Sequence, residues 1–193
     1  MVITREQLQA IVPSIKPAAL DTFLPHLQTL LPKYAIDTPQ RLGGFIAQVA
    51  HESAGFSAVR EFASGNAYEG RKDLGNTEPG DGPRFKGRGL IQVTGHGNYR
   101  WFSKDLFGDT RAVDNPELLT TPANAVLSAC WYWTTVKPMN AVCDHPEDWT
   151  HIWEHNGKTY TKIMWMTLLI NGGQNGIDER TANYQRARQV LNF

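Results

Sequence analysis

The chain has 193 residues, which is enough for one well-packed domain and few for two. Hydrophobic residues make up 41% and charged residues 20%, as in ordinary soluble globular proteins. Basic and acidic residues number 19 each, so no global field attracts nucleic acid or another polyanion. The N-terminus lacks the pattern of a signal peptide, and no apolar run is long enough to cross a membrane, so we expect a protein that starts in the cytoplasm.

The N-terminal third predicts two helices before the first motif. Thr4 and Gln7 fit a capping box that opens a short helix ending near Pro13. Apolar periodicity over residues 20–31 predicts a second helix with a kink or restart at Pro25.

The third predicted helix begins at Thr38-Pro39 and places an acid on its apolar stripe. Glu52 follows the stripe formed by Leu42, Phe45, Ile46 and Val49, and Gly55 is expected to end the helix just after it. Burying an unpaired charge costs several kcal/mol, and no basic residue lies within one helical turn on that face. We therefore expect Glu52 to be protonated and able to act as a general acid. The alternative is a buried acid with a structural role.

A second acid, Glu61, follows nine positions later in a polar context beside Arg60. We expect it to be ionised, although a solvated surface charge would give the same pattern. One protonated and one ionised carboxyl group at a common cleft is the arrangement that glycosidic bond cleavage requires. Residues 63–84 are rich in glycine and charge and predict a loop or flap, in which Tyr68 is the best candidate for stacking on a sugar.

Residues 85–99 predict a glycine-flanked strand. Alternation from Leu90 to Thr94 sends Gln92 and Thr94 to one face, where an amide and a hydroxyl suit binding of a sugar or a water. A polar outer face on an ordinary edge strand is an equally common reading. Short helices are predicted over residues 99–106 and from Thr121-Pro122 through Trp133.

Towards the C-terminus, residues 147–153 are a possible helix, and Asn156-Gly157 predicts a two-residue turn. An apolar helix from about Lys162 should end at Asn171, whose amide can face a ligand, and another helix should start near Asp178. Arg180 lies in its first turn and can pair with an acid across a cleft. A glycine C-cap followed by a surface arginine is the plainer interpretation.

The remaining residues with distinctive chemistry favour a core role. We expect Cys130 and Cys143 to be reduced core thiols and most of the six tryptophans to be buried. Only an aromatic residue in the flap or in the segment 147–153 is expected at a sugar site. The histidines and cysteines do not have the spacing of a metal site, so no metal and no cofactor are expected.

Three motifs in order resemble the family 19 glycoside hydrolases, which include chitinases and many phage endolysins. They are Ala50-His51-Glu52-Ser53 followed by Glu61, then residues 87–94 (GRGLIQVT), then Ile170-Asn171-Gly172-Gly173. The resemblance covers most of the chain from about Gln40. It implies a mainly helical, lysozyme-like fold with two lobes in a single domain over residues 1–193, with a small sheet or hairpin at the cleft.

The same resemblance implies roles for individual residues. Glu52 would be the general acid and Glu61 the general base, and Thr94 would help to hold the attacking water. Gln92, Asn98 and Asn171 match sugar-binding positions, and Arg180 matches an arginine near the acids. Asn175 stands where members of the family often carry a glutamate.

We therefore hypothesise an inverting endolysin that cuts β-1,4 bonds of peptidoglycan. It would be a monomer without a separate wall-binding module, would bind no nucleic acid and insert in no membrane, and would reach the wall through a membrane lesion in its host. The rivals are a chitinase, a non-catalytic glycan-binding domain, and a toxin delivered by one bacterium into another. An inverting enzyme should hold its two carboxyl groups roughly 6.5–9.5 Å apart.

Overall fold

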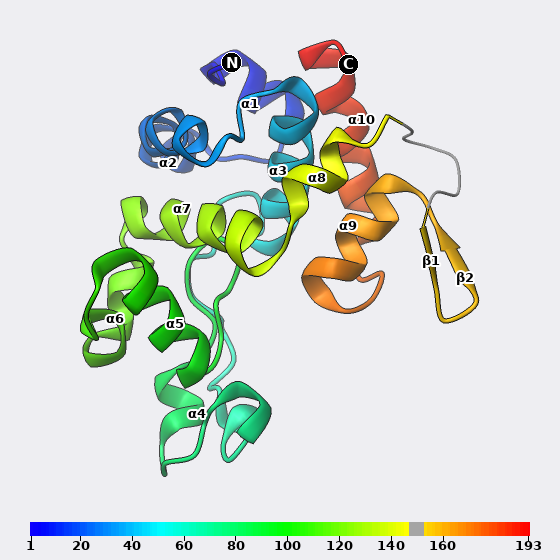
Figure 1. The fold of residues 1–193 in the computed structure, drawn as a ribbon. Helices are drawn as coiled ribbons and strands as arrows, with labels where there is room; N and C mark the ends of the chain where they lie inside the picture. The colour runs from blue at the N-terminus through cyan, green and yellow to red at the C-terminus, as the bar shows by residue number, and fades with distance from the viewer. Residues whose placement is uncertain (147–152) are drawn as a thin grey trace.

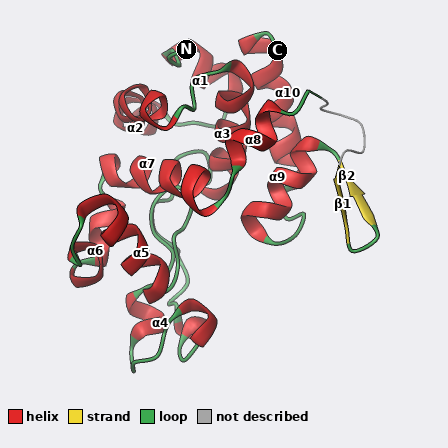
Figure 2. Ribbon diagram, viewed as in Figure 1, coloured by secondary structure: helices red, strands yellow, loops and turns green. Residues whose placement is uncertain are grey.

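The computed structural model describes residues 1–146 and 153–193, and it is mostly helical, as predicted (Figures 1 and 2). The α-helices are α1 (Arg5–Ile11), α2 (Pro17–Leu30), α3 (Pro39–Glu52), α4 (Asp81–Arg84), α5 (His96–Phe107), α6 (Arg111–Asp114), α7 (Pro122–Trp131), α8 (Met139–Asp144), α9 (Lys162–Asn171) and α10 (Ile177–Leu191). Short 3-10 helices are η1 (Leu31–Tyr34), η2 (Asn66–Tyr68), η3 (Lys72–Leu74) and η4 (Pro116–Thr120), and a π-helical segment, η5 (Tyr132–Val136), extends α7.

The helix α3 lies at the centre of the fold and packs along α10 (Figure 1). Thr38 caps its start, as predicted, and every residue from Leu42 to Ala50 is buried. The helix is therefore enclosed on all sides there, beyond the single apolar stripe that the sequence indicates. Gly43 and Gly44 allow this, because a Cβ at either position would lie within 3 Å of Phe193 or Cys143.

The helices form two groups that meet near α7 (Figure 1). Helices α1, α2, α3 and α10 lie together beside both termini, whereas α4, α5 and α6 lie at the opposite end. The segments that leave α3 and enter α5 run between the two groups. This arrangement puts the end of α3 where residues of both groups can reach it.

The strand predicted over residues 90–94 is wrong, because the chain reverses there. Arg88 and Val93 pair through two backbone hydrogen bonds (2.8 and 3.1 Å), and Gly89 and Gln92 at the corners have φ of +79° and +57°. Left-handed backbone at both corners turns the chain within four residues, which rules out an extended strand.

The only sheet among the described residues is the antiparallel hairpin of β1 (Trp153–His155) and β2 (Lys158–Tyr160). Its turn is Asn156-Gly157, as predicted, and both residues have positive φ, which is the geometry that a two-residue hairpin loop requires.

The structure agrees only in part with the elements predicted for the N-terminal helices and the flap. The capping box of Thr4 and Gln7 is present, but α2 continues through Pro25 without a restart. The predicted flap contains three short helices, η2, η3 and α4. The helix expected over residues 147–153 lies outside the described residues except for Trp153, which is in a strand.

Both cysteines are buried and they are not joined to each other in a disulfide. In the ranges 1–146 and 153–193, we find no helix that could cross a membrane. The same ranges hold no group of three or more His, Cys, Asp or Glu side chains placed to bind a metal ion.

Candidate active site

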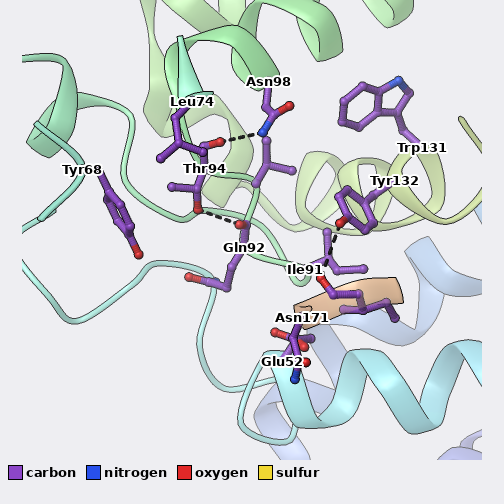
Figure 3. A pocket seen from close by; sticks show the side chains of 12 residues that line it. Glu52, Tyr68, Leu74, Ile91, Gln92, Thr94, Asn98, Trp131, Tyr132 and Asn171 are labelled. Carbon is purple, nitrogen blue, oxygen red and sulfur yellow. Dashed lines mark hydrogen bonds between the residues drawn. The ribbon is translucent and has the colours of Figure 1, made fainter. Parts of the chain in front are cut away.

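A pocket of about 400 Å³ opens at the C-terminal end of α3 (Figure 3). It is lined by Glu52, Tyr68, Leu74, Ile91, Gln92, Val93, Thr94, Asn98, Trp131, Tyr132, Ile170 and Asn171. These residues come from α3, the flap, the reversal at 88–93, α5, the α7–η5 helix and the end of α9. The pocket thus gathers side chains from both groups of helices, and among the described residues the hairpin β1–β2 contributes none of them.

Glu52 is the last residue of α3, and its carboxyl group is held by an arginine. Arg180 Nη2 donates to Glu52 Oε1 at 2.5 Å, and the two side chains are 1% and 17% exposed. This contact confirms the expectation that Arg180 pairs with an acid, and it shows that the basic partner of Glu52 comes from another helix and not from its own helical face. Its partner lies 128 positions further along the chain, where helix periodicity gives no information about it.

The guanidinium of Arg180 is anchored on its other sides by neutral oxygens. Its Nη1 donates to Gln48 Oε1 at 2.5 Å, and its Nε donates to the backbone oxygen of Asn175 at 3.1 Å. Gln48 is fully buried one turn before Glu52 and donates in turn to Thr167 on α9. A buried network whose members all have partners is rigid, so it fixes where the carboxyl group of Glu52 lies.

Glu61 is positioned by the segment 59–61 pairing with 87–89. Its backbone N–H donates to Gly87 O at 2.9 Å, and Gly87 N–H donates to Glu61 Oε2 at 3.1 Å. Tyr68 O–H donates to Glu61 Oε1 at 2.9 Å. Burial and the hydrogen bond to Glu61 both raise the pKa of Tyr68, so the phenol keeps the proton that it donates.

Glu61 itself lines a second hollow and is not among the residues that line the first pocket. Tyr68 connects the two, because it lines the first pocket while its hydroxyl contacts Glu61. Tyr68 therefore links Glu61 to the pocket that Glu52 lines.

Gln92 and Thr94 face the pocket together, as predicted, although a turn rather than a strand brings them there (Figure 3). Thr94 Oγ1 donates to Gln92 O at 2.9 Å, which leaves its lone pairs able to accept a hydrogen bond from a water. Asn98 lies one turn into α5 and donates to Thr94 O at 2.8 Å. The reversal and the start of α5 are thereby joined.

Asn171 ends α9 as predicted and lines the opposite side of the pocket (Figure 3). Its Nδ2 donates to the backbone oxygen of Asn175 at 3.2 Å, and its Oδ1 accepts from Gly173 N–H at 2.8 Å. The backbone oxygen of Asn175 thus receives hydrogen bonds from both Asn171 and Arg180.

Known proteins are similar to this chain in sequence and in fold. No protein-family model matches it. A glycosyl hydrolase family 19 domain-containing protein of Haemophilus influenzae is 29% identical, over 73% of this chain and 75% of the relative. The acidic 27 kDa endochitinase of Solanum lycopersicum is 30% identical, over 79% of this chain and 64% of its own length. Chitinase C from Streptomyces griseus has the same fold, with a TM-score of 0.68 at 21% identity, over 99% of this chain and 77% of that structure.

The chain belongs to glycosyl hydrolase family 19. It spans three quarters of the Haemophilus influenzae relative and slightly less than two thirds of the endochitinase. The fold that this family 19 member shares with chitinase C is the mainly helical architecture that the resemblance implies.

The flap of this family 19 chain contains a buried residue, Asn76, that no sequence pattern indicates. Asn76 is fully buried, donates to Tyr68 O at 2.8 Å and accepts from the backbone N–H of His96 at 2.8 Å. It therefore joins the residue that contacts Glu61 to the start of α5. An asparagine in a glycine-rich loop is ordinary for a turn, so its burial could not be read from the sequence.

A second missed element is the ion pair that supports the reversal. Arg88 is 5% exposed, and its Nε and Nη2 donate to Glu117 Oε1 at 2.9 and 2.8 Å. Arg60 contacts the other oxygen of Glu117. Burial alone would raise the pKa of Glu117, but the hydrogen bond and charge of Arg88, with the charge of Arg60, outweigh it and lower that pKa.

Proposed function

We propose that this family 19 chain hydrolyses β-1,4 bonds between amino sugars, with Glu52 as general acid and Glu61 as general base. The observation that carries this proposal is that Glu52 lines the first pocket and that Tyr68, which lines the same pocket, donates to Glu61. Arg180 holds the first glutamate, whereas Tyr68 and Gly87 hold the second. The reaction needs two carboxyl groups and a water, and no cofactor.

In the proposed mechanism, Glu52 donates a proton to the departing glycosidic oxygen. Glu61 removes a proton from a water that attacks the anomeric carbon from the opposite face, so the configuration inverts. Thr94 accepts a hydrogen bond from that water, since its own proton already goes to Gln92 O. Gln92, Asn98 and Asn171 offer amides to the hydroxyl and acetamido groups of the sugars.

We propose peptidoglycan as the substrate, as in an endolysin. The motifs resemble those of phage lysins, and cations lie beside Glu61 where an acidic glycan would pass. The setting inside a host cell, with exit through a membrane lesion, stays a prediction.

Chitin is the second candidate substrate. It is favoured by the names of several relatives, among them the endochitinases of Solanum lycopersicum and Pisum sativum. The chemistry at the two glutamates would be the same for both polymers. A non-catalytic glycan-binding domain is disfavoured, because both glutamates are present and anchored.

The test is mass analysis of the fragments that the purified chain releases from peptidoglycan, with chitin oligomers in parallel. Muramic acid at new reducing ends indicates a muramidase, and N-acetylglucosamine at these ends indicates a glucosaminidase. Cleavage of chitin oligomers alone would make the chain a chitinase. No cleavage of either polymer by wild-type protein would refute the hydrolase proposal, with Glu52→Gln as the blank for both reactions.

A further inference from the structure

A second hollow, of about 480 Å³, has Glu61 in its wall. It is lined by Val59, Arg60, Glu61, Phe62, Lys86 and Thr120. Glu61 is also hydrogen-bonded to Tyr68, which lines the first pocket, so the hollow adjoins the candidate active site. Phe62 and Lys86, which also line the hollow, have no part in the proposed mechanism.

Phe62 is the most exposed large apolar side chain among the described residues, at 92%. A single exposed phenylalanine is ordinary on a protein surface. This one directly follows Glu61 and lines the same hollow, so its ring is exposed beside the proposed general base. Aromatic rings offer a large apolar face, which packs well against the C–H face of a pyranose.

The hollow is lined by two basic residues, Arg60 and Lys86, and by one acid, Glu61. Lys86 Nζ donates to Ala63 O at 2.9 Å, and an ammonium group has two further N–H donors. Arg60 is 52% exposed on its side chain while it contacts Glu117. Both oxygens of Glu61 already accept hydrogen bonds from Tyr68 and Gly87. Since the chain as a whole carries no net charge, this local excess decides which glycans are attracted.

We propose that this hollow binds a muramic acid residue together with its acidic peptide stem. Phe62 packs against the sugar ring, and Lys86, assisted by Arg60, pairs with a carboxylate of the stem. This inference rests on the proposed function and deepens it, because chitin has no carboxylate for Lys86 to meet. The hollow would then be the part of the cleft that distinguishes peptidoglycan from chitin.

The test compares kcat/KM on soluble peptidoglycan fragments that carry their peptide stems with kcat/KM on neutral chitin oligomers of similar length. For Lys86→Glu we expect the ratio of the two values to fall about fivefold, which corresponds to about 1 kcal/mol for an exposed ion pair. Lys86→Arg keeps the charge and should retain most of the preference.

The matched control is Lys33→Glu, which makes the same change of net charge at an exposed site in η1. It should leave the ratio as in the wild type, because its charge lies outside the pocket and the hollow. Equal ratios for Lys86→Glu and Lys33→Glu would overturn the inference, since attraction by overall charge would then explain both.

Phe62 has its own readout. Phe62→Ala should raise KM on both glycans several-fold, whereas Phe62→Tyr, which keeps an aromatic face, should stay near the wild type. An unchanged KM for the alanine variant on both substrates would remove Phe62 from the site. Melting curves that match the wild type ensure that the exposed substitutions act on binding and not on folding.

Failure of this inference and failure of the proposed function give different results. If the wild-type protein releases nothing from peptidoglycan but cuts chitin oligomers, peptidoglycan specificity fails and the inference fails with it. If the wild-type protein cuts peptidoglycan and Lys86→Glu cuts it with an unchanged preference, the proposed function stands and the inference alone is wrong.

Discussion

Replacing Glu52 with glutamine tests both the chemistry and the buried ion pair. Glutamine keeps the shape of the side chain but has no acidic proton to give to a leaving group. General acid catalysis contributes roughly 10²–10⁴-fold, so kcat should fall by that factor. Removal of the acid should leave KM much less affected, because the amide can still contact the sugar.

The same substitution also changes the group that Arg180 contacts in the interior. Truncating one partner of a buried ion pair costs about 3–5 kcal/mol. Glutamine retains an oxygen that can accept from Arg180 Nη2, and the side chain of Glu52 is 17% exposed, so we expect a smaller cost of about 1–3 kcal/mol. For a protein of this size that corresponds to a fall in Tm of about 2–12 °C. The sequence alone predicts no change in the melting curve, because it does not show that Arg180 is buried against Glu52.

Steady-state hydrolysis of a chromogenic amino-sugar oligomer and differential scanning calorimetry measure the two effects separately. Glu179→Gln is the matched control, because Glu179 is a nearby glutamate that contacts His51, is 51% exposed and does not line the pocket. It should keep activity within a few-fold of the wild type and lower Tm only slightly. More than a tenth of wild-type kcat in Glu52→Gln would refute its role as the acid, and an unchanged Tm would refute the energetic coupling to Arg180.

Four further predictions follow from the geometry. Thr94→Ser should keep much of the activity, whereas Thr94→Val should lower kcat far more than it raises KM; equal kinetics for valine and wild type would remove Thr94 from the mechanism. Proton NMR of the first product from a β-linked substrate should show the α-anomer, and initial β-anomer would refute inversion. Asn76→Ala should lower kcat/KM by loosening Tyr68, with hydrogen exchange faster in the flap; unchanged exchange at residues 66–76 would argue against this role. In the folded state the pKa of Glu117 is lowered below its ordinary value of 4.5. The difference in Tm between wild type and Glu117→Gln should therefore be largest above pH 4.5 and should shrink as the pH falls through the lowered pKa. A difference in Tm that does not depend on pH would contradict the pairing with Arg88.

Most of the helical architecture could be predicted from local sequence patterns. The capping box at Thr4, the start of α3 at Thr38-Pro39 and the turn at Asn156-Gly157 all depend on neighbouring residues, and each is present in the structure. The strand expected at 90–94 failed because two corner residues take left-handed backbone, which alternation of polar and apolar residues does not reveal. Gly89 is a turn signal that the sequence shows, but nothing in the sequence indicates that Gln92 has a φ of +57°.

The residues of the candidate site were found by their motifs, and so was Arg180 as the partner of an acid, whereas the contacts of Glu61 with Tyr68 and Gly87 were not. Glu52, Thr94 and Asn171 line one pocket as the spacing and the resemblance indicate. Glu61, in contrast, lines a separate hollow and reaches the pocket through its hydrogen bond with Tyr68, and no pattern in the sequence predicts that partition.

By itself, the sequence determined which segments form helices and which residue types bring acid, base and amide chemistry, because those properties depend on residues within a few positions of one another. The sequence indicated that Arg180 pairs with an acid, but only the tertiary structure decided that this acid is Glu52, 128 positions away, and that buried Asn76 contacts Tyr68 in the flap. These contacts depend on how α3, α10 and the flap pack. The cost of burying a charge or an amide can be offset by any suitable partner that the fold brings near, and distance along the chain does not limit which partner that is.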